Sequence, residues 1–296
     1  MCVFYAAAKP RTILVMSSAG EAYGARVRAV NEQRRRLSGR SYEDDVWTGG
    51  RAERFRSDPR RKPEAVLQAI IDYLRPDDVV LDVGGGAGRF GLALALHCRE
   101  LIDVDPSAGM RQVFESVAAE AGIKNARYVE SDWLSAQGIA GDVSLTSSVT
   151  YFVEDIVRFI EQLHAASRRR VIILVSAEPG PNGGSELFRA VYGEELVLAP
   201  GYRELLPVMW ELDILPDVRV IEPRDSAGLR VYPTREELME ASLTTSSLSG
   251  APRERALAAF ESHFDGLFAA TEGGYRRRRL PDGRQILITW VTGVGA

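Results

Sequence analysis

The sequence predicts an α/β fold: a seven-stranded, mostly parallel sheet with helices on both faces and an antiparallel last strand. Three observations predict it. From about residue 63, short apolar runs alternate with segments of helical periodicity, which indicates parallel strands joined by helical crossovers. A glycine-rich turn follows the first of these runs, and an acidic residue follows each of the next two. Residues in such positions gather at one edge of a parallel sheet.

Composition narrows the class of protein. The chain has 296 residues, 45% of them hydrophobic and 26% charged, as is typical of soluble globular proteins. The net charge of −4 gives no general attraction to nucleic acid or anionic membranes. Cys2 and Cys98 form neither a disulfide framework nor a metal-ligand pattern, so we expect a cytoplasmic protein without a metal. No apolar run approaches the ~20 residues of a membrane span.

The N-terminal segment, residues 1–62, is expected to be mostly helical and to cover a substrate. Residues 12–16 have the pattern of a short strand, and residues 21–40 that of an arginine-rich helix. Trp47 and Phe55 stand out in the polar stretch that follows. We therefore treat this segment as separate from the domain of residues 63–296.

The remaining elements follow from apolar periodicity and from turn residues at their ends. Strands are predicted at residues 79–81, 101–104, 126–129, 143–147, 171–175 and 218–221. Helices are predicted at residues 63–74, 90–97, 110–121, 155–167, 186–198 and 202–211. Two helical inserts are expected, at about 179–215 and 236–270, and residues 276–280 and 285–291 have the pattern of a hairpin.

The turn after the first strand carries the strongest chemical signal. Its sequence runs from Asp82 through Val-Gly-Gly-Gly-Ala-Gly to Arg89. Glycine permits a sharp turn and lets a ligand approach where a Cβ would collide. The free N–H groups of the helix start that follows favour an electron-rich group. Asp82 is a carboxylate at the end of a buried strand, which is costly unless a cation or N–H donor pairs with it.

Four groups of residues fall at the ends of successive strands. They are the turn with Asp82, Gly84, Gly86 and Gly88, then Asp105, then Asp132-Trp133, then Ser147-Ser148. Together they resemble the class I (Rossmann-like) S-adenosylmethionine-dependent methyltransferases. The resemblance covers about residues 63–178 well and the sixth and last strands more loosely.

The resemblance implies a role for each matching residue. The turn, with Gly85 as a further member, would pass under the methionine part of S-adenosylmethionine, and Asp82 would orient its amino group. Asp105-Pro106 would hold the ribose hydroxyls, since a carboxylate accepts two hydrogen bonds from a diol. Asp103 competes for that role, but we expect it on the opposite face of the strand.

Later strand ends complete the implied cofactor site. Asp132 would receive the adenine amino group, and Trp133 would flank the ring. Ser147, Ser148 and Tyr151 would lie against the sulfonium. Asp132 could instead cap a helix start, and the serines could be ordinary turn residues. S-adenosylhomocysteine would be the product.

A nicotinamide-dependent oxidoreductase is the nearest rival. Gly86-Ala-Gly-Arg-Phe-Gly91 fits G-x-G-x-x-G, and Asp105 follows at about the ~20-residue spacing of a ribose acid. That register places Asp82 within the strand, where dinucleotide-binding folds have apolar residues. This observation favours the methyltransferase.

The acceptor is not identified by the sequence. Residues 147–152 lack the Asn/Asp-Pro-Pro-Tyr motif of enzymes that methylate exocyclic or amide nitrogens, so we expect a small-molecule acceptor methylated on oxygen or nitrogen. Tyr151 and Tyr202 are the candidates for a polar contact with it. An RNA methyltransferase that uses the N-terminal arginines, and a methyltransferase-like binding module without turnover, stay open as alternatives.

Overall fold

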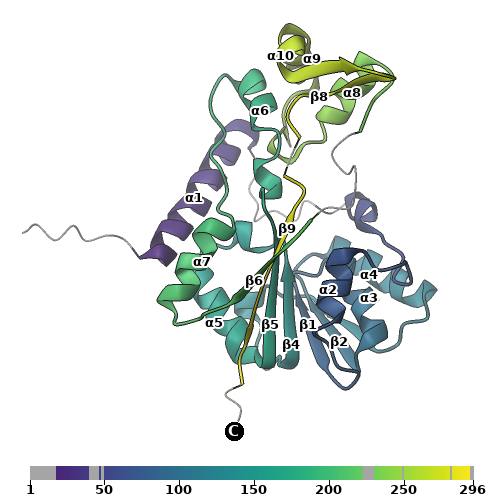
Figure 1. Cartoon of the computed structure of the whole chain (residues 1–296), viewed down its shortest axis with the longest axis vertical. Coiled ribbons are helices and arrows are strands. Elements are labelled where there is room, and N and C mark those ends of the chain that lie inside the picture. The colour runs from purple at the N-terminus through teal and green to yellow at the C-terminus, as the bar shows by residue number, and fades with distance from the viewer. Residues whose placement is uncertain are drawn as a thin grey trace, which may run out of the picture.

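The computed structural model describes the chain except for residues 1–17, 40–46, 48–49, 223–229, 249, 281 and 294–296. The strand predicted at residues 12–16 lies outside the described residues. The rest forms one large sheet with a helical layer on each face and a smaller group of elements beyond one end of the strands (Figure 1).

The large sheet has seven strands in the order β3-β2-β1-β4-β5-β9-β6. β1 to β5 pair in parallel, whereas β9 pairs antiparallel with both β5 and β6. This confirms the predicted sheet with its antiparallel last strand. The strands are β1 Val79–Val83, β2 Glu100–Val104, β3 Ala126–Val129, β4 Gly141–Ser147, β5 Ser167–Ser176, β6 Asp217–Ile221 and β9 Gln285–Val291.

Helices cover both faces because successive residues of a strand point to opposite sides. Leu81 and Val83 of β1 pack with α1 Ala19–Ser38, α5 Ile156–Ala166 and α7 Tyr202–Glu211. Val80 packs on the other side with α2 Ala65–Ile71, α3 Gly91–Leu94 and α4 Ala108–Glu120. The described residues also form six short 3₁₀ helices: η1 Arg51–Phe55, η2 Ala95–His97, η3 Trp133–Ser135, η4 Thr150–Phe152, η5 Gly180–Asn182 and η6 Ser246–Leu248.

A smaller group of elements, which we call the cap, has its own core. Phe260, Phe264 and Phe268 pack there with Leu187 and Leu238. Gln285 at the start of β9 pairs with Ser176 at the end of β5, so the cap lies beyond the carboxyl ends of the parallel strands (Figure 1). Its elements are α6 Ser185–Tyr192, α8 Arg235–Ser242, α9 Arg253–Ser262, α10 Phe264–Leu267, β7 Phe268–Thr271 and β8 Gly274–Arg277.

The predicted C-terminal hairpin is wrong. β8 pairs with β7 in a separate two-stranded sheet, whereas residues 285–291 pair with β5 and β6. Gly273, at φ 84°, and Gly274, at φ 143°, form the tight turn between β7 and β8, a backbone conformation that favours glycine. The first predicted insert is divided between two places, because α6 lies in the cap and α7 packs on the sheet.

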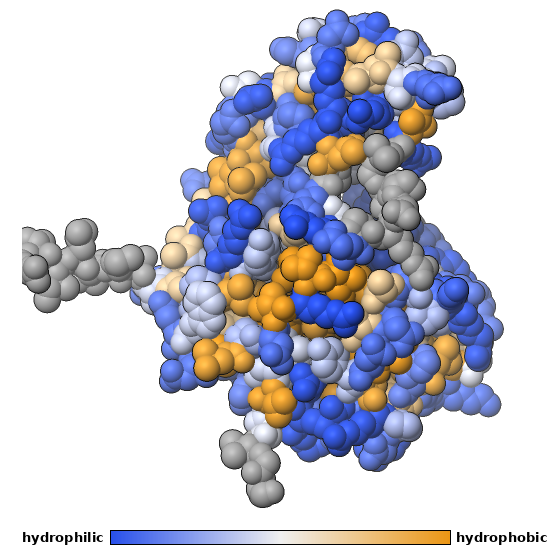
Figure 2. Space-filling model, in the orientation of Figure 1, coloured by the Kyte–Doolittle hydropathy of each residue, from blue (hydrophilic) through white to orange (hydrophobic). Residues whose placement is uncertain are grey.

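The edge strand β6 is only partly covered. Figure 2 shows hydrophobic residues gathered at the centre of one face, in the region where Figure 1 draws β6 and β9. Val218 and Val220 of β6 are 46% and 50% exposed. The helical layers therefore protect the sheet less completely at this edge. In the part of the chain that the structure describes, no helix is both long and apolar enough to span a lipid bilayer.

Candidate functional site

The turn after β1 is held tightly from both sides. Gly84, Gly86 and Gly88 have φ of 71°, 61° and 78°, in the left-handed region that glycine adopts without strain. The Gly84 N–H donates to the Val104 carbonyl at 2.8 Å. A Cβ on Gly84 would lie 2.3 Å from Val149, which follows β4. The turn therefore needs glycine for its conformation and for its packing.

Two buried acids lie beneath this turn. Asp82 is 1% exposed and Asp103 0% exposed, and they are neighbours in the pairing of β1 with β2. Burial and the nearby Asp105 raise the pKa of Asp82 to about 7, partly offset by the Gly91 N–H. Burial and the charge of Asp82 raise the pKa of Asp103 well above its usual range. Both groups therefore favour the protonated form far more than an exposed aspartate does.

The expectation that Asp103 faces away from Asp105 is wrong. Asp103 lies beside Tyr128 in the pairing of β2 with β3, and the Tyr128 hydroxyl donates to Asp105 Oδ1 at 3.2 Å. Residues two apart in a strand point to the same face, so both acids lie on the α4 side of the sheet. Asp82 lies within β1 and not beyond its end.

Asp105 lies directly after β2, at the carboxyl end of the strand, which we call the rim of the candidate site. It is half-buried, and its Oδ1 also accepts from the Ser107 N–H at 2.9 Å. The Tyr128 hydroxyl further donates to the Ser107 carbonyl at 3.0 Å. Partial burial and then the nearby Asp105 and Asp103 raise the pKa of Tyr128, which keeps this hydroxyl protonated as a donor. Sequence reasoning missed Tyr128, although its place in the third strand was the available signal.

The two residues predicted after the third strand do not lie together: Asp132 is at the surface, whereas Trp133 is in the core. Asp132 is exposed and its side chain accepts from the Leu134 N–H at 2.9 Å, so it caps η3 as a helix-start residue does. Trp133 is 4% exposed and packs in the core beneath α5. Pro106 is exposed beside Asp105. The roles of these three residues toward adenine and ribose stay predictions.

The loop after β4 contains a strained residue. Ser148 has φ 59°, which is uncommon for a residue with a Cβ and concentrates at functional sites. Its N–H donates to the Leu174 carbonyl of β5 at 2.9 Å. Ser147 is half-buried at the end of β4, and Ser148 is exposed. The strand pairing thus fixes the backbone here while the Ser148 side chain stays accessible.

Tyr151 is built into the same loop. It is 2% exposed, and its hydroxyl accepts from the Ser176 N–H at 2.6 Å. Burial raises the pKa of Tyr151, so the hydroxyl stays protonated at neutral pH. Tyr202, the other candidate, is half-buried at the start of α7, and Arg203 donates to its hydroxyl at 3.2 Å.

Helix α1 closes over this loop. Tyr23 is 1% exposed and its hydroxyl donates to the Thr150 carbonyl at 2.9 Å. A Cβ on Gly24 would lie 2.8 Å from the Glu154 carbonyl, so the helix and the loop are in close contact. Elsewhere in the N-terminal segment, the rings of Trp47 and Phe55 make an edge-to-face pair with their centroids 4.9 Å apart. The 3₁₀ helix η1, which ends at Phe55, packs on α4.

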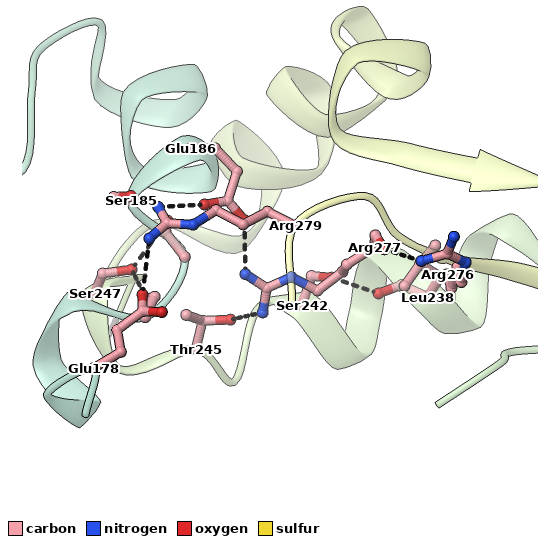
Figure 3. Close-up of polar contacts among 12 residues, drawn as sticks. Glu178, Ser185, Glu186, Leu238, Ser242, Thr245, Ser247, Arg276, Arg277 and Arg279 are labelled. Carbon is pink, nitrogen blue, oxygen red and sulfur yellow. Dashed lines mark hydrogen bonds and ion pairs between the residues drawn. The ribbon is translucent and has the colours of Figure 1, made fainter. Parts of the chain in front are cut away.

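An ion-pair network joins the cap to the sheet edge. Figure 3 shows Arg277 and Arg279 directed toward Glu186 on α6, with Glu178 on the other side of Arg279. Arg277 Nη2 lies 2.8 Å from Glu186 Oε1, and Arg279 Nη2 lies 3.1 Å from Glu178 Oε1. Glu178 also accepts from the Asp282 N–H at 3.1 Å. Glu178 follows β5 closely, so this network fixes the cap above the carboxyl edge.

Glu186→Gln is expected to lower the free energy of unfolding by about 1–3 kcal/mol. The Arg277 and Glu186 side chains are 22% and 17% exposed, so the neutral amide leaves a largely buried cation with a weaker partner. Urea denaturation measures the loss. Glu195→Gln is the control: Glu195 and Arg189 are 75% and 63% exposed, where an ion pair contributes little. Equal losses in the two variants would contradict the structural role of the network.

A separate hollow is too small for a nucleotide. It lies between α1, α6 and η6, is lined by residues such as Arg34 and Tyr192, and shares none of its lining with the glycine turn. Its cavity volume of about 30 Å³ corresponds to one or two water molecules. This hollow is therefore not the candidate site, which lies at the glycine turn and the strand ends around it.

Comparisons with known proteins concern this same region. Residues 80–169 match a family described as "Methyltransferase domain". An uncharacterized methyltransferase of Mycobacterium sp. (strain JLS) is 35% identical over 124 residues, which cover 40% of this chain and 47% of that protein. The chain spans about half the length of the curated relatives that it matches.

Two solved structures have the same fold. A putative methyltransferase from Bacillus halodurans C-125 gives a TM-score of 0.55 at 12% identity, over 78% of this chain and 98% of that one. The YcgJ protein from Bacillus subtilis gives 0.52 at 18% identity, over 77% and 98%. The family match favours a methyltransferase over a nicotinamide enzyme. The sheet order and the glycine turn described above agree with this match, so residues 80–169 are similar to a methyltransferase domain and lie in a fold that methyltransferase structures share.

Proposed function

We propose that this chain transfers a methyl group from S-adenosylmethionine to the oxygen or nitrogen of a small-molecule acceptor. One observation carries the proposal. Asp105, fixed by Tyr128 and Ser107, stands beside a glycine turn in which a Cβ on Gly84 or Gly85 would lie 2.3 or 2.2 Å from a neighbouring side chain. A carboxylate that accepts from a diol, next to a backbone cradle, suits a bound nucleoside.

The residues present fit S-adenosylmethionine. The turn from Gly84 to Gly88 would hold the methionine part, and Asp105 with Pro106 would hold the ribose. Asp132 would receive the adenine amino group beside Trp133. Asp82 lies beneath the turn rather than on its outer side, so we assign its effect on the amino group to its charge. When bound, the donor supplies a methyl group on a positively charged sulfur.

The chain's own residues would position the acceptor and exclude water. Holding two reactants at near-attack distance supplies much of the acceleration of such a displacement. Ser147 ends β4 and Ser148 stands on the fixed loop that follows, and Tyr23 of α1 packs on that loop. Tyr151 stays protonated, so it can donate a hydrogen bond but does not act as a base. Tyr202 at the start of α7 is the second candidate for a polar contact with the acceptor.

Ion pairing supports a small acceptor over RNA. Arg277 and Arg279 are paired with Glu186 and Glu178, and Arg36 of α1 lies 2.5 Å from Glu194. Each pairing removes a cation from the set available to phosphates. The net charge of −4 acts in the same direction.

The test is a methyl-transfer assay on fractionated extract. The protein is incubated with S-[methyl-³H]adenosylmethionine and extract separated into small molecules, RNA and protein, with Asp105→Ala as the control. We expect Asp105-dependent label in the small-molecule fraction. Label in RNA would favour the RNA methyltransferase, and tight donor binding without label in any fraction would favour a binding module.

A further inference from the structure

The acid pair beneath the glycine turn is unusually close. A Cβ placed on Gly85 would lie 2.2 Å from Asp103 Oδ2 and 2.6 Å from Asp82 Oδ2. These two oxygens are therefore no more than about 5 Å apart. Among the described residues, none donates a well-formed hydrogen bond to any of the four carboxylate oxygens of the pair. If both acids were ionised, two negative charges would therefore lie close together without a well-formed hydrogen bond from any described residue.

The surroundings offer little to stabilise two negative charges. The titratable groups that act on the pair are Asp105, which adds a third carboxylate, and Tyr128 from β3. The N–H groups of Gly85 and Gly91 face the two acids and favour the charged form only in part. Side chains of the same sheet face, such as Leu101, are apolar. A single proton between the acids relieves the repulsion and supplies the missing donor.

We propose that Asp82 and Asp103 share one proton at neutral pH, with the Asp103 carboxyl donating a hydrogen bond to the Asp82 carboxylate. The pair then carries one negative charge directly beneath the turn. The raised pKa of both groups agrees with this arrangement. Asp103 is thus a positioning residue: it holds Asp82 and the turn without needing a charge of its own.

The shared proton is tested first in the protein without donor. Infrared spectra at pH 8 with ¹³C-labelled aspartate are expected to show a protonated carboxyl band. Asp103→Asn should remove this band, whereas Asp77→Asn, at an exposed turn residue, should keep it. A wild-type spectrum without the band at pH 8 would overturn the proposal, whatever ligand the protein binds.

A second arm of the test measures ligand binding by two Asp103 variants. It distinguishes an Asp103 that acts as a neutral hydrogen-bond donor from one that acts through its charge. The Asn amide donates a hydrogen bond as the carboxyl does, so Asp103→Asn should keep S-adenosylmethionine affinity within about threefold at pH 8. Asp103→Ala should weaken binding at least about tenfold, because Asp82 loses its donor. Equal tenfold losses in both folded variants would show that the charge of Asp103 is required, against the proposal. This arm rests on the proposed function, whereas the infrared arm does not.

The pair also predicts a pH dependence of stability with a definite sign. The pKa of Asp82 is about 7 in the folded chain and near 4 when unfolded. The contribution of Asp82 to the free energy of unfolding is therefore most favourable below pH 4, and it is lost as pH rises through 7. Asp82→Asn removes this loss, so the melting temperature of the variant relative to wild type should be higher at pH 8 than at pH 5. A relative melting temperature independent of pH would contradict the raised pKa of Asp82.

Discussion

Gly85→Ala is expected to weaken binding of S-adenosylmethionine by more than about 100-fold and to destabilise the fold by about 1–3 kcal/mol. The new methyl group would lie 2.2 Å from Asp103 Oδ2 and 2.6 Å from the Asp82 carboxyl carbon. Both acids are on buried strands and cannot move aside, so the turn itself must shift. A cradle made of backbone depends on that geometry.

The measurement is calorimetric titration with S-adenosylmethionine, together with urea denaturation to confirm that the variant is folded. Gly266→Ala is the matched control, since a Cβ there meets nothing within 4 Å and the residue lies in the cap. We expect the control to bind as wild type does. If Gly85→Ala binds as tightly as the control, the turn does not form the donor cradle.

Asp105→Ala is expected to weaken donor binding by about 1–3 kcal/mol, or roughly 5- to 150-fold. The reason is that ribose hydroxyls buried at the rim would lose their acceptor. Tyr128→Phe should cost less, about two- to fivefold, because it removes only one of the two described hydrogen bonds to Asp105 Oδ1.

Titration of both variants with S-adenosylmethionine and S-adenosylhomocysteine checks this order. Both ligands contain the same ribose, so each variant should lose affinity for them equally. Unchanged binding in Asp105→Ala would assign the ribose to another acid. Asp103 could not readily replace it, because it is fully buried beneath the turn.

Much of the sheet could be predicted because most of its strands contain a short apolar run bounded by turn residues. β3 at Ala126–Val129 and α7 at Tyr202–Glu211 have the predicted bounds, since turn residues and helical periodicity mark both ends. β1 and β5 extend beyond their predicted apolar runs to Val83 and Ser176. Pairing with neighbouring strands, which a single sequence does not display, sets these longer limits.

The C-terminal pairing could not be predicted from local signals. Residues 276–280 and 285–291 are separated by a turn sequence, which favours a hairpin when only neighbours are considered. Yet Ile286, Leu287 and Ile288 are all nearly fully buried, and such a run belongs inside a large sheet. The partner strand β5 lies more than 100 residues earlier, so only the folded chain brings them together.

The acidic residues of the candidate site were likewise predictable only in part. Local patterns indicate their positions, whereas their contacts depend on how the strands pair. The positions of Asp82, Asp105 and Asp132 at successive strands could be predicted from the alternation of strands and helices. The pairing of Asp82 with Asp103 depends on strand register, which places them side by side. The two-residue period of a strand, continued one residue past the end of β2, already predicts Asp103 and Asp105 on one face. The close contact of Tyr128 with Asp105 required the third strand in place.

The central claim is that the glycine turn and the rim acid Asp105 form a pocket for S-adenosylmethionine. Calorimetric titration of the wild-type protein with S-adenosylmethionine, S-adenosylhomocysteine and NAD(H) tests it most directly. We predict saturable binding of the donor and of its demethylated product to one site per chain, and no binding of NAD(H). Binding of NAD(H) alone would contradict the account.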